Sequence, residues 1–327
     1  RGPWLNGERV MFRAPLTVDV EQFSIDPDNL RPHEVLLRTH KTVISPGTEL
    51  ARLQGKIMWE SDDPQEFPMP VVGYANIGTV IDAGSETGVK PGDRVYTMAN
   101  HATIARIDCR HFLCVPVPEG LSDEDAVFSR LATVSMTTLV TTFARPGDSV
   151  AVIGLGLVGN LAAQVFQASG YEVHGFDLSP RRREIARECG IQSVHDADAM
   201  TKFSQVHRLI IEATGSAKAL AGCVDMAAPG GEIVMIGAPW GGEANSVPSS
   251  QITRLLFYRF LRLRSGSEWE IPRQPEPLVN GSNHQNSVTA LQWLADGRLT
   301  VQPLITHRIR PAEAADHRQD RARHRRG

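Results

Sequence analysis

Short apolar runs alternate with stretches of helical periodicity through the middle of the chain. The runs are SVAVIG, YEVHGFD, RLIIEAT and EIVMIGA, and the stretches between them end in glycine, the residue favoured just after the last turn of a helix. Continuous apolar strands that alternate with helices predict a parallel sheet covered on both faces. The sequence therefore predicts an α/β fold with a doubly wound domain over residues 121–261.

A glycine-rich loop joins the first of these strands to the helix that follows it. Gly154, Gly156 and Gly159 stand in a G-x-G-x-x-G pattern, which provides a tight turn, a close backbone approach to a pyrophosphate and close helix packing. The phosphates would sit against free amides at the start of the helix, at Leu157 and Val158. The pattern alone is weak evidence, but the strand before it and the helix after it supply the required context. We therefore expect a dinucleotide-binding site here.

The residue that ends the next strand indicates which dinucleotide is bound. Asp177 lies 18 residues beyond Gly159, where a carboxylate can accept both ribose hydroxyls of the adenosine. This favours NAD over NADP, because a carboxylate would repel a 2′-phosphate. Arg181, Arg182 and Arg183 follow and could bind that phosphate instead; the other interpretation is a solvated helix face. The candidate cofactor-binding residues are Gly154, Gly156, Leu157, Val158, Gly159, Asp177, Arg182, Thr214 and Gly237.

Composition narrows the range of partners. The formal net charge of −3 argues against a general nucleic-acid surface, which needs a basic excess. No apolar run approaches the ~20 residues that a membrane helix needs, and the first residues do not resemble a secretory signal. We therefore expect a cytoplasmic protein that binds a small molecule and neither nucleic acid nor a membrane.

The chain before residue 121 has a different character. From Leu36 to Val117 it holds short β-like runs separated by Pro-Gly and Gly-Ser turns, which predicts a compact β-rich unit. Ser122 can cap a helix that we expect to continue until just before Arg145. The residues after 261 are too few for a separate core. We therefore expect one domain over 1–120, completed by 262–327, with a basic, low-complexity end from His317.

Together these segments resemble the medium-chain dehydrogenase/reductase superfamily, which includes the zinc alcohol and polyol dehydrogenases. The resemblance runs from about Val35 to about Ala315 and is most specific in VVGYANIGTV, in VKPGDRVY, in the glycine loop with Asp177, and in LADGRLTVQPLITHRI. It implies a GroES-like catalytic domain beside a Rossmann domain. It also implies a homodimer, paired along EIVMIGA and the segment that follows it.

The positions that match the superfamily's catalytic zinc ligands carry other residues. Pro46 takes the place of a cysteine, Tyr74 replaces a histidine, Ala75 removes a glutamate, and the third ligand would fall near Ser129. Zinc prefers thiolate, imidazole and carboxylate ligands, so we expect no metal here. The SPGTE stretch at residues 45–49 is similar to a zinc-poor subgroup that includes bacteriochlorophyllide hydroxyethyl dehydrogenases and natural-product pathway enzymes.

The resemblance also implies roles for individual side chains. Thr48 matches the hydroxyl residue that passes on the substrate proton, and Glu49 matches an acidic residue that could orient Thr48 or act as the base. Tyr74 can donate to the substrate oxygen or relay its proton. His101 and Trp269 are candidates for substrate binding. Packing or turn roles for Tyr74, Thr48, His101 and Trp269 remain open alternatives.

These observations lead to three functional hypotheses. The first is a zinc-independent, NAD-dependent oxidoreductase acting on a secondary alcohol or ketone, such as a cyclic polyol, a sugar-like compound or a tetrapyrrole intermediate of a biosynthetic pathway. The second is an NAD(P)H-dependent reductase of a conjugated C=C bond or quinone. The third is a catalytically inactive partner protein that binds the cofactor.

Overall fold

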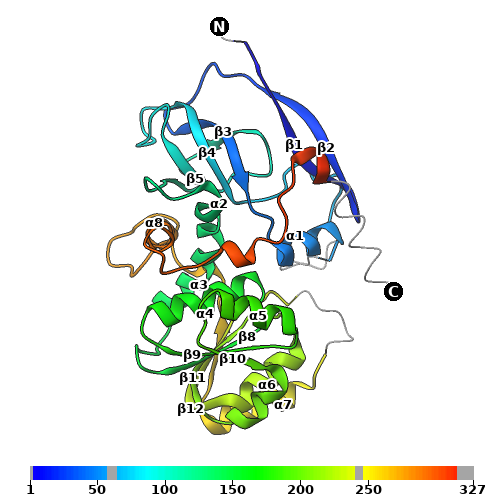
Figure 1. The fold of residues 1–327 in the computed structure, drawn as a ribbon, viewed down its shortest axis with the longest axis vertical. Coiled ribbons are helices and arrows are strands. Elements are labelled where there is room, and N and C mark those ends of the chain that lie inside the picture. The colour runs from blue at the N-terminus through cyan, green and yellow to red at the C-terminus, as the bar shows by residue number, and fades with distance from the viewer. Residues whose placement is uncertain (1–2, 57–64, 240–245, 315–327) are drawn as a thin grey trace. The chain divides into compact units, whose positions relative to one another are not determined.

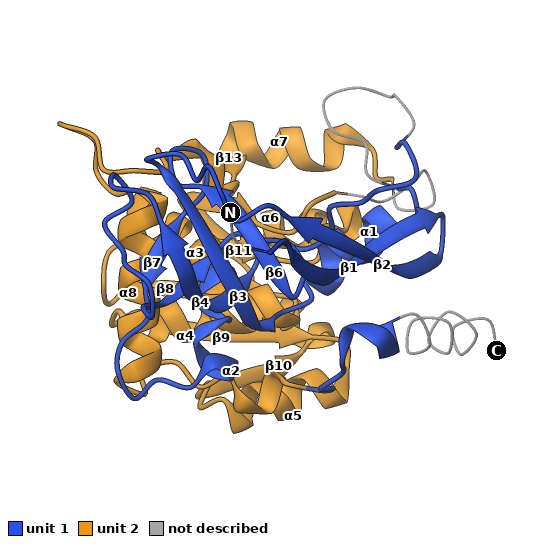
Figure 2. Ribbon diagram, turned by 90° about the horizontal axis from the view of Figure 1, so that it is seen from above, with its two compact units in different colours: residues 1–130, 306–327 blue, residues 131–305 orange. Residues whose placement is uncertain are grey.

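The computed structural model describes residues 3–56, 65–239 and 246–314. They form two compact units, which comprise residues 1–130 with 306–327 and residues 131–305 (Figure 2). The basic end from His317 lies outside the described residues. Within the described ranges, no helix is both long and apolar enough to cross a membrane.

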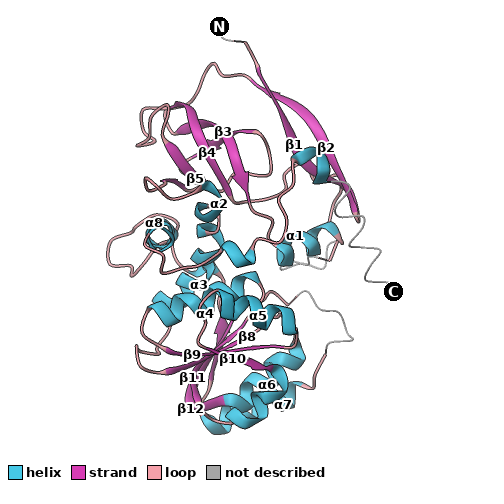
Figure 3. Cartoon of the chain, in the orientation of Figure 1, coloured by secondary structure: helices cyan, strands magenta, loops and turns pink. Residues whose placement is uncertain are grey.

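The first unit is built on antiparallel strands (Figure 3). Five of them form a sheet in the order β6-β3-β4-β5-β7, and β1 pairs with β2 in a separate hairpin that the sequence analysis did not predict. Apolar side chains of β3 to β6 pack into a core that supports this sheet. The strands are β1 (Leu5–Ala14), β2 (Thr17–Ile25), β3 (Glu34–Thr42), β4 (Asn76–Ala83), β5 (Arg94–Thr97), β6 (Ile104–Asp108) and β7 (Cys114–Pro116). The unit's helical segments are α1 (Pro46–Leu53), α2 (Asp123–Ala126) and η5 (Pro311–Glu313).

The run VVGYANIGTV is only partly a strand, because β4 begins at Asn76. Before it, Gly73 has φ of +92°, a conformation that side chains with a Cβ rarely adopt. A Cβ on Gly73 would lie 2.7 Å from the ring of His101. The backbone therefore bends here and leaves Tyr74 on an irregular segment at the entrance to the strand.

The second unit is a doubly wound sheet, as the sequence predicts. Its parallel strands lie in the order β10-β9-β8-β11-β12-β13, and Figure 1 shows α4 and α5 on one face with α6 and α7 on the other. The strand order reverses between β8 and β11, which is where ligands bind in such sheets, at the carboxyl ends of the strands. The strands are β8 (Ser149–Ile153), β9 (Glu172–Asp177), β10 (Ser193–Asp196), β11 (His207–Glu212), β12 (Ala227–Met235) and β13 (Arg262–Ser265). The helices are α3 (Ser129–Thr141), α4 (Leu157–Ala168), α5 (Pro180–Glu188), α6 (Ala217–Met226), α7 (Ser249–Arg259), α8 (Asn283–Ala295) and the 3₁₀ segments η1 (Ala197–Phe203), η3 (Glu268–Glu270) and η4 (Gln302–Leu304).

The unit boundaries differ from the expected 1–120, 121–261 and 262–327. Residues 262–305 belong with the parallel sheet, because β13 adds its last strand and α8 packs against α3, where the Asn286 amide donates to Thr137 at 3.5 Å. Residues 121–130 belong with the first unit. The expected helix from Ser122 is two helices, although Ser122 does cap the first of them by accepting from the Asp125 amide at 3.1 Å.

Three histidines pack together on neighbouring strands of the parallel sheet. Nδ1 of His174 and Nε2 of His195 are 3.3 Å apart, and the ring centroids of His174 and His207 are 5.3 Å apart. His207 is fully buried, and its Nδ1 lies 2.9 Å from the Ser149 hydroxyl. Burial, followed by the neighbouring imidazoles, lowers the pKa of His207 from 6.5 to about 4. The folded protein therefore favours the neutral imidazole of His207.

We expect acidification to destabilise the protein through His207. Its folded pKa lies below its unfolded pKa, so its contribution is complete above 6.5 and is lost as the pH falls toward 4. The shift corresponds to about 2 kcal/mol of unfolding free energy between pH 7 and pH 5. Urea unfolding at both pH values should show a smaller pH dependence for His207→Gln than for the wild type. An equal pH dependence in His207→Gln and in the wild type would contradict the assignment.

Candidate functional site

The glycine loop has the geometry of a pyrophosphate cradle. Gly156 is the N-cap of α4 and offers no side chain to the first amides of the helix. A Cβ on Gly156 would meet no atom within 4 Å, so the loop is open on that side. A Cβ on Gly159 would lie 1.8 Å from the carbonyl oxygen of Gly154, so only glycine allows the helix to approach its strand this closely. The residues present therefore fit a dinucleotide, whose phosphates the amides of Leu157 and Val158 would bind.

Asp177 is placed to connect this loop with a ribose. Its carboxylate accepts from the Leu155 amide at 2.7 Å and from the Ser179 amide at 2.8 Å. The side chain is largely buried at the end of β9, and each oxygen keeps a further lone pair for a hydroxyl donor. The aspartate thus fixes the loop and remains able to accept hydrogen bonds from ribose hydroxyls.

The three arginines after Asp177 have different surroundings. Arg181 pairs with Glu184 at 2.6 Å on the outer face of α5, as the solvated-face interpretation predicts. Arg183 donates to the Asp177 carbonyl at 2.8 Å and pairs with Asp196 at 2.7 Å. Arg182 is exposed, with its guanidinium 3.7 Å from the Asp177 carboxylate. Arg182 is therefore the arginine nearest to where a ribose would bind.

Thr214 and Gly237 lie at the carboxyl ends of β11 and β12, beside the glycine loop. The Thr214 methyl group lies 2.6 Å from where a Cβ on Gly154 would stand. The Gly237 amide donates to the carbonyl of Glu212 at 2.9 Å. The buried Glu212 side chain accepts from the Thr214 amide at 2.7 Å, from its hydroxyl, and from the Gly215 amide at 3.1 Å. Burial raises the pKa of Glu212, and these donors oppose that effect.

Sequence reasoning did not identify Glu212. A signal was present, because this glutamate ends an otherwise apolar strand, RLIIEAT, and a buried carboxylate needs hydrogen-bond donors. Its donors come from the turn that follows the strand. Glu212 therefore holds that turn in place next to the cofactor loop.

In the first unit, the SPGTE stretch forms the start of α1. Pro46 occupies the first helical position, which its fixed φ favours, and Ser45 is the N-cap. The Ser45 hydroxyl makes no capping bond. Instead, the Glu49 carboxylate accepts from the Ser45 amide at 2.7 Å. This arrangement leaves the hydroxyls of Ser45 and Thr48 available to other groups.

Glu49 and His101 form a buried pair. Oε2 of Glu49 and Nε2 of His101 are 2.8 Å apart, and the two side chains are 1% and 6% exposed. With Nε2–H donating to the carboxylate, Nδ1 is the acceptor nitrogen, and it has no hydrogen-bond partner among the described residues. His101 is thus buried beside the bend at Gly73 and linked to a residue of the expected catalytic set.

Tyr74 lies among polar groups. Its hydroxyl interacts with the hydroxyls of Ser45 and Thr48, and the guanidinium carbon of Arg130 lies 4.8 Å from its ring centroid. Burial raises the pKa of Tyr74, and the nearby Glu49 adds to this, whereas Arg130 and the two hydroxyls lower the pKa. The structure therefore brings Thr48, Glu49, Tyr74 and His101 into one cluster, as the sequence analysis expected for the first three.

Arg130 is the member of this cluster that sequence reasoning missed. It is only 4% exposed, in the first turn of α3. The signal was a single arginine within the apolar stretch AVFSRLATV, because an arginine is rarely buried without compensating contacts.

The residues at the expected metal positions do not fit zinc. Pro46 has no ligand atom in its side chain, and Tyr74 and Ser129 offer hydroxyls where zinc prefers thiolate, imidazole or carboxylate. Within the part of the chain that the structure describes, no group of three His, Cys, Asp or Glu side chains is arranged to hold a metal ion.

Trp269 lies in the second unit, on η3. Its side chain is 49% exposed, and the guanidinium carbon of Arg273 lies 5.1 Å from its ring centroid. The Ser267 hydroxyl accepts from the Trp269 amide at 3.4 Å and begins the 3₁₀ turn. The indole is therefore accessible for stacking, while the segment that carries it is ordered.

Comparison with known proteins agrees with this arrangement. Residues 158–269 match the family model described as zinc-binding dehydrogenase. L-threonine 3-dehydrogenase from Rhizobium johnstonii is 25% identical over 93% of this chain and 92% of its own length. The 2-desacetyl-2-hydroxyethyl bacteriochlorophyllide A dehydrogenase of Cereibacter sphaeroides is 28% identical over 87% of this chain and 85% of its own. These similarities support the resemblance to the medium-chain dehydrogenase/reductase superfamily.

A solved structure shares the fold of this chain. A zinc-binding dehydrogenase from Sinorhizobium meliloti 1021, bound to NADP, superposes with a TM-score of 0.76 at 18% identity, covering 96% of this chain and 95% of that one. This likeness confirms the expected GroES-like and Rossmann domains. Together with the dehydrogenase relatives, it supports a nicotinamide cofactor and an oxidoreductase activity.

Proposed function

We propose that this protein is a zinc-independent, NAD-dependent dehydrogenase that interconverts a secondary alcohol and a ketone. The observation that carries the proposal is Tyr74, which stands where a metal-binding histidine is expected and is surrounded by the hydroxyls of Ser45 and Thr48 and the Arg130 guanidinium. The cofactor loop supports the nicotinamide part of the proposal, and Asp177 supports NAD in particular.

The side chains of the first unit suit proton transfer from a hydroxyl group. When bound, the nicotinamide supplies the hydride acceptor or donor. The Tyr74 hydroxyl holds the substrate oxygen and exchanges its proton, and Thr48 and Ser45 connect that hydroxyl to other acceptors. Glu49 orients the start of α1 through the Ser45 amide, and His101 donates a hydrogen bond to the Glu49 carboxylate.

The relatives guide the choice of substrates. One is named for a hydroxyethyl-substituted bacteriochlorophyllide and the other for L-threonine. The similar SPGTE stretch supports the first kind more than the second. We therefore propose a ring-bearing secondary alcohol, such as a cyclic polyol, a sugar-like compound or a tetrapyrrole side chain, in a biosynthetic pathway.

The first experiment is elemental analysis of the purified protein together with fluorescence titration of NADH and NADPH. We expect less than roughly a tenth of an equivalent of zinc, because the donor set is wrong for it, and tighter binding of NADH than of NADPH. A panel of cyclic alcohols, ketones and enones then follows. Stoichiometric zinc that is needed for turnover would overturn the metal-free mechanism, and NADPH-dependent reduction of an enone alone would favour the C=C reductase.

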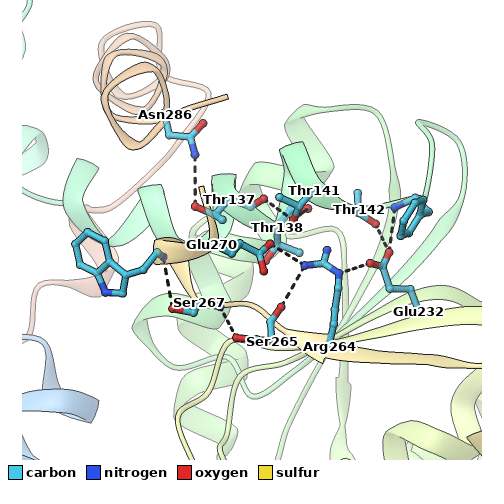
Figure 4. A network of polar contacts seen from close by, with 12 residues as sticks. Thr137, Thr138, Thr141, Thr142, Glu232, Arg264, Ser265, Ser267, Glu270 and Asn286 are labelled. Atoms are coloured by element: carbon cyan, nitrogen blue, oxygen red, sulfur yellow. Dashed lines mark hydrogen bonds and ion pairs between the residues drawn. The ribbon is translucent and has the colours of Figure 1, made fainter. Parts of the chain in front are cut away.

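We also propose a homodimer formed through β13. The expected pairing strand EIVMIGA is enclosed between β11 and β13, so the sheet edge next to it is β13. On β13, the Arg264 guanidinium pairs with the carboxylates of Glu232 and Glu270, and its Nη1 lies 3.0 Å from Oε1 of Glu270 (Figure 4). These ion pairs hold the strand to residues of its own unit. Phe260, which precedes β13 by two residues, is exposed, as is Leu278 further along the same unit, and an open strand edge beside exposed apolar side chains favours pairing.

Light scattering after gel filtration should give the mass of a dimer. Phe260→Glu combined with Leu278→Glu should give a monomer, because two charges would be buried without partners. Val206→Glu, at an exposed position elsewhere in the same unit, is the control and should remain dimeric. A wild-type monomer at micromolar concentration would contradict the proposal.

A further inference from the structure

Arg130 carries a buried positive charge at the place where the resemblance puts the metal. It follows Ser129 directly, and its side chain is almost completely buried against the face of the Tyr74 ring, 4.8 Å from guanidinium carbon to centroid. A guanidinium removed from water is costly unless a specific group compensates for it. An arginine stacked on an aromatic ring is also held in one orientation, so its charge is fixed relative to the phenol.

The groups around Tyr74 are unequal in charge. From the N-cap and first turn of α1 come the neutral hydroxyls of Ser45 and Thr48 and the carboxylate of Glu49, and from α3 comes the guanidinium of Arg130. The Glu49 carboxylate already has partners in the Ser45 amide and in His101. Arg130 is thus the positive group that acts on the phenol most directly. A phenolate formed here would be destabilised by burial and by Glu49, and stabilised by Arg130.

We propose that Arg130 is a positioning residue that supplies the fixed positive charge of this site and stabilises the Tyr74 phenolate during proton transfer. The inference rests on the proposed function. In the oxidation direction, the substrate O–H bond breaks and its proton forms an O–H bond with the Tyr74 phenolate oxygen; a bound oxidised nicotinamide would accept the hydride of the same carbinol carbon. The phenol afterwards passes the proton to solvent through the neighbouring hydroxyls. Reduction reverses each step, so protons and electrons balance.

A fluorinated tyrosine at position 74 measures this effect directly. Its phenol ionises at lower pH than that of tyrosine, so ¹⁹F NMR can follow the titration while the protein remains folded. Arg130→Gln keeps a planar polar head group without the charge, and Arg130→Lys keeps the charge. Arg9→Met is the matched control, because Arg9 stacks on Phe23 at 5.3 Å in the same unit.

We expect Arg130→Gln to lower the acid dissociation constant of the fluorotyrosine roughly tenfold or more, because the positive charge acts over about 5 Å in a partly dehydrated site. The rising limb of the pH profile of kcat should move to higher pH in the same variant with natural Tyr74. Arg130→Lys should recover most of both effects, and Arg9→Met should change neither.

Two outcomes would separate this inference from the proposed function. An unchanged fluorotyrosine titration in Arg130→Gln, with an active wild-type enzyme, overturns the role of Arg130 alone. A wild-type protein that turns over no alcohol or ketone overturns the proposed function. If Arg130→Gln does not fold, the fluorotyrosine titration in Arg130→Lys decides. A dissociation constant near that of the wild type supports the role of the positive charge, and a roughly tenfold change refutes that role.

Discussion

Replacement of Tyr74 by phenylalanine should lower kcat by roughly 10²- to 10⁴-fold and leave NADH binding unchanged. This range is typical for the loss of a group that transfers a proton in the transition state. Phenylalanine keeps the ring against Arg130 and removes only the hydroxyl that interacts with Ser45 and Thr48. Steady-state kinetics with the best substrate of the panel, together with NADH titration by fluorescence, give both values.

A buried tyrosine in the second unit serves as the control. Tyr171 donates its hydroxyl to the carbonyl of Ala144 at 3.1 Å in the second unit. Tyr171→Phe should cost about 1 kcal/mol of stability and leave kcat unchanged. Full activity of Tyr74→Phe would assign Tyr74 to packing and would move the search for the proton-transfer group to Glu49 and His101.

The parallel sheet could be predicted because its central strands are continuous apolar runs with a helix between each pair. β10 and β13 escaped prediction, since their sequences SVHD and RLRS are short and half polar. Such strands form because a neighbouring strand offers an edge, which local sequence does not reveal. The same reason explains the unit boundary, because β13 carries residues after 261 into the parallel sheet.

The candidate site could be predicted only where a motif marks it. The glycine loop, Asp177 and the SPGTE stretch follow recognisable patterns, and Thr48, Glu49 and Tyr74 do lie together. Arg130 and Glu212 are buried charges whose partners are distant in sequence or lie in a turn. Their roles depend on tertiary contacts, so the sequence could indicate an unusual residue but not what it contacts.

Replacement of Asp177 by alanine should raise the KM for NAD by roughly ten- to a hundredfold, because hydrogen bonds from two ribose hydroxyls to a carboxylate are lost. The change also leaves the Leu155 amide without its acceptor, which costs about 1–3 kcal/mol of stability. Thermal unfolding with and without saturating NADH measures that part separately. Glu184→Ala removes an exposed carboxylate from the helix that follows and should leave both KM and stability nearly unchanged.

The ratio of KM values for NAD and NADP distinguishes the two consequences of losing Asp177. A loosened glycine loop would raise the KM for NAD and the KM for NADP by the same factor, since both cofactors present the same pyrophosphate to the amides of α4. Loss of the ribose contact weakens the binding of NAD alone. Removal of the negative charge strengthens the binding of NADP, whose 2′-phosphate would then meet the exposed Arg182. We therefore expect the preference for NAD to fall by more than tenfold. An unchanged preference would place the adenosine ribose elsewhere and withdraw the choice of NAD over NADP.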